Sequence, residues 1–234
     1  MTLYKVTGEN GESCHGGSGR WTEGKWRTIP AKRTIVPCQT GFHLVEAKDL
    51  VRWLGPVIWE AEFEGESIDH GDKLVVRKAR VIRKLHNWNE RTARLFAADC
   101  AEHVLPLFEK RYPNDARPRQ AIDVARRSAN GEATREEMAA AWDAAWDAAW
   151  DAAGDAAGAA ARAAAGDAAW AAARAAAGAA ARAAAGDAAR AVAGVAAGDA
   201  AGAAARAAAG TAELKWQTAR LMDYLEGHAA EPQP

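Results

Sequence analysis

The alternation of apolar and polar residues predicts strands in the first third of the chain and helices after it. Between residues 57 and 64, apolar side chains at every second position alternate with glutamates, which is typical of a strand with one buried face. Residues 74–85 follow a turn predicted at 65–72 and return as a long partner strand. Shorter strands are predicted at residues 3–6, 35–36 and 41–44, and a short helix at residues 46–54.

From residue 87 onward, apolar residues recur at helical spacing. Asn87 followed by Glu90 predicts the cap of one helix, and Thr134 followed by Glu137 predicts the cap of another. These signals divide the chain into three predicted parts. They are a small α+β domain at residues 1–86, a helical domain at residues 87–228, and a disordered tail at residues 229–234.

Residues 139–210 form an alanine-rich tract in which almost every fourth residue is Trp, Gly or Arg, often followed by Asp. Alanine is the strongest helix former, so helix is the expected state of the tract. A step of four residues advances the variable positions by about 40° per repeat, so no single partner helix can follow them. We therefore expect several packed helices that end at glycines. The predicted fold class is α+β, with a small mixed N-terminal domain followed by an all-α, Ala-rich multi-helix bundle.

Three tryptophans, Trp142, Trp146 and Trp150, open this tract and form one apolar helix face that spans about 80°. If the face is buried, it is a seam in the core. If it is exposed, it is a surface that binds a protein partner. The sequence leaves both interpretations open, and the three tryptophans are the candidate partner-binding residues.

Composition narrows the classes of function. The 30 basic and 31 acidic residues give a net charge of -1, which argues against a dedicated nucleic-acid or membrane-surface protein. Three widely spaced cysteines do not form a disulfide framework and fit a reducing compartment. The first residues lack a signal-peptide pattern, and charged residues interrupt the alanine tract too often for a membrane span. We expect a cytoplasmic protein without a cofactor.

Two groups of residues carry candidate chemistry. Cys14, His15, Cys38 and His43 could supply four zinc ligands, but their spacing is not a recognised ligand pattern, so reduced thiols and ordinary histidines are favoured. The basic strand at residues 73–84 could meet phosphates, but pairing with the glutamates of the neighbouring strand is favoured. No nucleophile, base and orienting group occur at usable spacing, so no catalytic residue is predicted.

The segment Ala97–Phe108, continued by Arg117-Pro118-Arg119, Ile122, Ala125-Arg126 and Gly131-Glu132, resembles an immunity-protein-like helical family associated with bacterial toxin systems. Upstream, Pro37–His43 and the strand at 57–64 resemble a small domain of unknown function found in phage and bacterial proteins. Together the two resemblances cover most of residues 1–140. They imply an all-helical, non-catalytic part that binds another protein. Neither resemblance assigns a functional residue in this sequence.

Three functions follow from these observations. The prediction is an immunity- or antitoxin-like binding protein of phage or bacterial origin, which holds a toxin or a host factor at the tryptophan face. One alternative is a structural element whose alanine-rich helices pack on a second copy to form a homo-oligomer. The other alternative is an N-terminal domain that binds nucleic acid or acts as an enzyme, because its order of elements is similar to ADP-ribosyltransferase-like folds. For that enzyme, the sequence offers no clear acidic catalytic residue.

Overall fold

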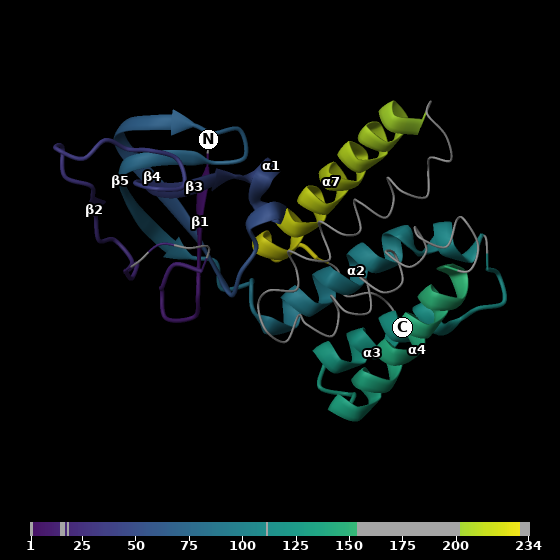
Figure 1. The fold of residues 1–234 in the computed structure, drawn as a ribbon. Helices are drawn as coiled ribbons and strands as arrows, with labels where there is room; N and C mark the ends of the chain where they lie inside the picture. Colours follow the sequence, from purple (N-terminus) through teal and green to yellow (C-terminus); the bar gives the residue numbers. More distant parts are fainter. Residues whose placement is uncertain (1, 15–16, 18, 111, 154–201, 230–234) are drawn as a thin grey trace.

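The computed structural model describes residues 2–14, 17, 19–110, 112–153 and 202–229 (Figure 1). An antiparallel sheet occupies the N-terminal region and helices follow it, so the fold class is α+β as predicted. Residues 154–201, the middle of the alanine-rich tract, lie outside the described residues. The number of helices expected there therefore stays a prediction, and so does the division of the chain into three parts.

The sheet has five antiparallel strands in the order β2-β5-β3-β1-β4, and β4 also pairs with β5. Hydrogen bonding therefore runs from β5 through β3 and β1 to β4 and back to β5, so the sheet closes on itself. Closure gives β1, β3 and β4 a partner on both sides, whereas β2 pairs with β5 alone. The strands are β1 Leu3–Thr7, β2 Arg27–Thr28, β3 Phe42–Glu46, β4 Val57–Asp69 and β5 Leu74–Lys84.

The long β4–β5 hairpin confirms the strand pair read from the alternating pattern, with one correction. β4 continues to Asp69, whereas the sequence predicted a turn from residue 65. Gly65 has a φ of 79°, and the register of the two strands shifts between Glu64 and Ser67. The glycine therefore marks an irregularity within the strand, of the β-bulge kind, and the chain turns only after residue 69.

The outer face of this hairpin is a ladder of ion pairs. Glutamates of β4 face cations of β5, as favoured from the sequence. The pairs along the hairpin are Glu60 with Arg83, Glu62 with Arg80, Glu64 with Lys78, and Glu66 with Arg77.

The strand predicted at 35–36 is wrong, because Val36 makes only an isolated bridge to Thr40.

The described chain also contains six helical segments, and capping residues explain where two of these helices begin. The predicted cap of α2 is wrong by two residues: Asn89 accepts from the Thr92 amide at 3.1 Å, and Thr92 Oγ1 accepts from the Asn89 amide at 2.9 Å. The capping box of Thr134 with Glu137 is confirmed at the start of α4. The segments are α1 Ala47–Leu50, η1 Val51–Trp53, α2 Glu90–Glu109, α3 Arg117–Ala129, α4 Arg135–Ala153 and α7 Gly202–Glu226.

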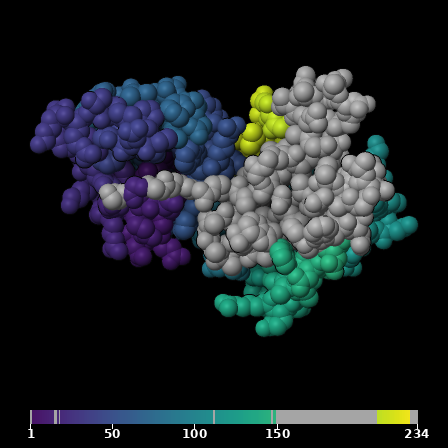
Figure 2. All heavy atoms as spheres, viewed as in Figure 1, coloured from purple at the N-terminus to yellow at the C-terminus, as the bar shows by residue number. Residues whose placement is uncertain are grey.

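One hydrophobic core joins the sheet to the helices. Tyr4 and Ile58 of the sheet pack with Phe96 of α2 and with Leu221 and Tyr224 of α7. The C-terminal part of α7 thus contacts α1, η1 and α2. In the space-filling view, the visible part of α7 lies beside the sheet region (Figure 2). A second core lies between α2, α3 and α4 and contains Ala98, Leu105, Ile122, Ala125 and Ala148.

Candidate partner-binding helices and a basic cavity

The structure places all three candidate tryptophans on α4. Trp142 is half-buried and packs near Ala121 of α3 and Ala145 of α4. The side chains of Trp146 and Trp150 lie outside the described residues. Trp142 therefore contributes to the α3–α4 contact and keeps part of its ring at the surface, and the role of the face in binding a partner stays a prediction.

A buried carboxylate, Asp99, ties three helices together. Its side chain is 7% exposed and accepts hydrogen bonds from Arg126 of α3 at 2.9 Å and from Arg220 of α7 at 2.8 Å. The hydroxyl of Tyr224 donates to the same carboxylate at 2.7 Å. A buried charge of this kind is stable only when its oxygens are satisfied, and here three donors satisfy them.

The electrostatics of this cluster follow from burial and charge pairing. Burial and the nearby charge of Asp99 both raise the pKa of Tyr224 above its ordinary value, so the phenol stays protonated and remains a donor. Burial alone would lower the pKa of Arg126, but hydrogen bonds to Glu102 and Asp99 raise it. Arg126 therefore stays charged and Tyr224 stays neutral across the physiological range of pH.

A second polar group joins α2 to α7. Glu213, which is buried, lies 2.7 Å from His103 Nδ1 and accepts from Gln217 Nε2 at 2.9 Å. The ring of His103 stacks on Trp216 with ring centroids 3.8 Å apart and planes 9° apart. These contacts use polar side chains of the described helices to fix α7 against α2.

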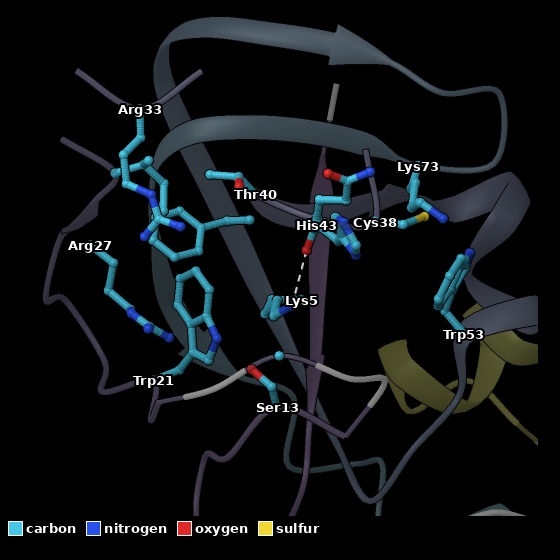
Figure 3. Close-up of a pocket in the computed structure, with 15 residues that line it drawn as sticks. Lys5, Ser13, Trp21, Arg27, Arg33, Cys38, Thr40, His43, Trp53 and Lys73 are labelled. Carbon is cyan, nitrogen blue, oxygen red and sulfur yellow. Dashed lines mark hydrogen bonds between the residues drawn. The ribbon is translucent and has the colours of Figure 1, made fainter. Parts of the chain in front are cut away.

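A cavity of about 370 Å³ opens in the sheet region (Figure 3). Two of the residues weighed as zinc ligands, Cys38 and His43, line it. Cys14 does not line it, and His15 lies outside the described residues. Within the described ranges, no three His, Cys, Asp or Glu side chains come together in a way that could hold a metal ion. Burial, Lys5 and Lys73 lower the pKa of His43 to about 4, so its ring is neutral at neutral pH.

Of the charged side chains of this cavity, the sequence singled out only Lys73, as part of the basic strand at residues 73–84. These side chains come from β1, β2, the loop before β3 and the turn before β5, which local patterns cannot bring together. One signal was available: Lys5 interrupts the otherwise apolar strand Leu3–Val6. A cation between apolar strand residues suggests polar surroundings on that side of the strand. The cations that line the cavity are Lys5, Arg27, Arg33 and Lys73.

A family model described as Imm-5 like putative immunity protein matches residues 83–224. Because the match covers more than half of the chain, this protein belongs to that family. The matched region begins at the end of β5 and contains α2, α3, α4, most of α7 and both buried polar groups, whereas the cavity lies outside it. Neither the curated proteins nor the solved structures gave a match. Of the helices that the structure describes, none combines the length and apolar character that a membrane crossing needs.

Proposed function

We propose that this protein is an immunity protein of bacterial or phage origin that binds and neutralises a toxin protein in the cytoplasm. The observation that carries the proposal is the family match across the helical region, residues 83–224. The binding requires no chemistry by this chain. In support, Asp99 and Glu213 in the matched region are both buried, and each contacts a side chain of another helix.

The tryptophan face of α4 is the proposed contact surface. Large aromatic side chains supply much of the binding energy at protein interfaces, because each removes a wide apolar surface from water. The α2–α3–α4 core holds α4 in place, so the face would be presented by a preorganised helix. Trp142 is half-buried, which leaves part of its ring for a partner.

Growth protection tests this proposal. The full chain is co-expressed with the toxin encoded beside it, and the growth of cells that carry both genes is compared with that of cells that carry the toxin alone. Wild-type chain should restore growth. The variant with Trp142, Trp146 and Trp150 changed to Ala should protect less, while its circular dichroism stays that of a folded helical protein.

The matched control is Trp26→Ala, which removes a half-buried tryptophan of the sheet region and should protect like wild type. If the wild-type chain gives no protection from the toxin of its own locus, the immunity function is wrong. If the triple variant is folded and protects fully, the immunity function stands and the α4 surface is wrong.

A further inference from the structure

The cavity in the sheet region is unusual in its charge. Its described lining contains four cations and neither Asp nor Glu. Ser13, Gln39 and Thr40 add neutral side chains that can donate hydrogen bonds. Figure 3 shows Arg27 and Arg33 on one side, Lys73 on the other and Lys5 between them. A recess with this lining favours an anion.

Aromatic rings lie against three of these cations. Lys5 Nζ lies 5.2 Å from the centre of the Trp21 ring, and the Arg27 guanidinium lies 4.8 Å from the same ring. Lys73 Nζ lies 4.5 Å from the centre of the Trp53 ring, with the carboxylate of Asp72 at 3.7 Å. A cation–π contact holds a cation in place without cancelling its charge, so the positive potential remains available inside the cavity.

The outer face of the hairpin shows the contrasting arrangement. Lys78 also lies over a tryptophan ring, that of Trp26 at 4.6 Å, but there Glu64 contacts the ammonium at 2.5 Å. Every cation in the ladder along that face has a glutamate opposite it. The described lining of the cavity itself contains no Asp or Glu, although Asp72, which does not line the cavity, pairs with Lys73.

Among these cations, Lys5 gives the strongest indication that the cavity binds an anion. Its ammonium donates to the backbone oxygen of His43 at 3.1 Å, and no carboxylate of the described residues pairs with it. Burial lowers the pKa of Lys5 to about 8, which still leaves the side chain largely charged at neutral pH. The neighbouring His43 ring is neutral at neutral pH, so it adds no charge of its own to the cavity. A half-buried, poorly solvated ammonium without a counter-charge is costly, and a bound anion would offset that cost.

We propose that this cavity binds the phosphate group of a small phosphorylated molecule, with Lys5, Arg27 and Lys73 as its ligands. Three cations from three separate elements suit a doubly charged group with several oxygens better than a single carboxylate. Arg27 can hold two phosphate oxygens with its planar guanidinium, and Lys5 and Lys73 contribute point charges.

The size and shape of the site favour a small molecule over a nucleic-acid strand. A volume of about 370 Å³ falls in the range of small-ligand pockets. A strand would need a basic surface that follows its backbone, but glutamates neutralise the outer face of β5. The site lies outside residues 83–224, so the proposal does not depend on the proposed immunity function.

Calorimetry and tryptophan fluorescence on the full chain test the site. Inorganic phosphate and adenosine 5′-monophosphate are titrated at constant ionic strength, with acetate as the monoanionic control and a single-stranded oligonucleotide as the polymer. Phosphate and the nucleotide should bind saturably and change the emission of Trp21 and Trp53, which line the cavity. Acetate and the oligonucleotide should bind far more weakly.

Lys5→Gln should reduce phosphate affinity by about tenfold to a hundredfold, because it removes one charge-assisted hydrogen bond. Lys78→Gln is the matched control and should leave affinity unchanged. If Lys5→Gln does not fold, Lys73→Gln carries the same expectation. The proposal is overturned if neither phosphate compound binds saturably, if acetate competes equally, if the folded cavity variant binds like wild type, or if only the oligonucleotide binds. Toxin protection is measured in parallel and should be the same in both lysine variants.

Discussion

Replacing Asp99 by Asn should destabilise the protein more than any single change to a surface ion pair. Asp99 is 7% exposed, and the side chains of its partners Arg126 and Arg220 are 16% and 21% exposed. Asn keeps the shape of the side chain but removes its negative charge. The two arginines, which are themselves poorly solvated, then lose a counter-charge. Removing one partner of a buried ion pair costs about 3–5 kcal/mol.

The lower end of that range applies here. Arg126 keeps Glu102 at 2.5 Å and Arg220 keeps Asp223 at 3.6 Å after the substitution. We therefore expect a loss of about 3 kcal/mol in the free energy of unfolding. Urea unfolding at neutral pH, followed by far-UV circular dichroism and tryptophan fluorescence, measures this loss as a lower midpoint with an unchanged slope.

Glu109→Gln is the matched control. Glu109 also joins α2 to α3, through bonds of 2.7 and 2.8 Å to Arg119, but its side chain is 32% exposed and that of Arg119 is 47% exposed, far more than Asp99. Exposed ion pairs contribute about 0–1 kcal/mol, so this variant should unfold close to the wild-type midpoint. Equal midpoints for Asp99→Asn and Glu109→Gln would refute the view that the buried carboxylate holds the helices together.

Three further substitutions test separate parts of the structure. Tyr224→Phe removes the 2.7 Å hydrogen bond to Asp99 and should cost about 1–2 kcal/mol in urea unfolding. Thr134→Ala removes the cap of α4, because the Thr134 hydroxyl accepts a hydrogen bond from the Glu137 amide at 3.0 Å. The variant should lose about 1 kcal/mol in the free energy of unfolding, measured in urea. A urea midpoint equal to that of wild type would mean that the cap is dispensable. His43 has a folded pKa of about 4, below its unfolded value, so the unfolded state takes up the proton first and stability falls as pH drops from about 6.5 to 4. His43→Asn should therefore lose less thermal stability than wild type across that pH interval. If the melting temperatures of the two proteins fall in parallel with pH, the lowered pKa of His43 is contradicted.

Local patterns were sufficient for the elements that they specify directly. The alternation of apolar residues with glutamates places the β4–β5 hairpin, because a strand with one buried face has a period of two. The pair Thr134 and Glu137 places the start of α4, because a capping box is complete within four residues. Both features depend on interactions between residues that are close in sequence or follow one simple period.

The features that could not be predicted from the sequence depend on contacts between residues that are far apart along the chain. β2 has only two residues, too few to carry a pattern, and it exists because β5 offers it a pairing edge. Asp99 meets Arg220 across a separation of 121 residues. Lys5 is close to Arg27 and Lys73 only because the sheet closes on itself. No local spacing rule reports such contacts, so the buried ionic cluster and the basic cavity emerged only with the fold.

The mass of the complex in solution tests the central claim most directly. Purified full-length protein is mixed with the purified toxin encoded in the same locus, and size-exclusion chromatography with light scattering gives the mass of each species. Because an immunity protein acts by holding its toxin, we predict one species whose mass equals the sum of the two proteins, formed together with loss of toxin activity. Two separate species at their individual masses, with the toxin still active, would contradict the account.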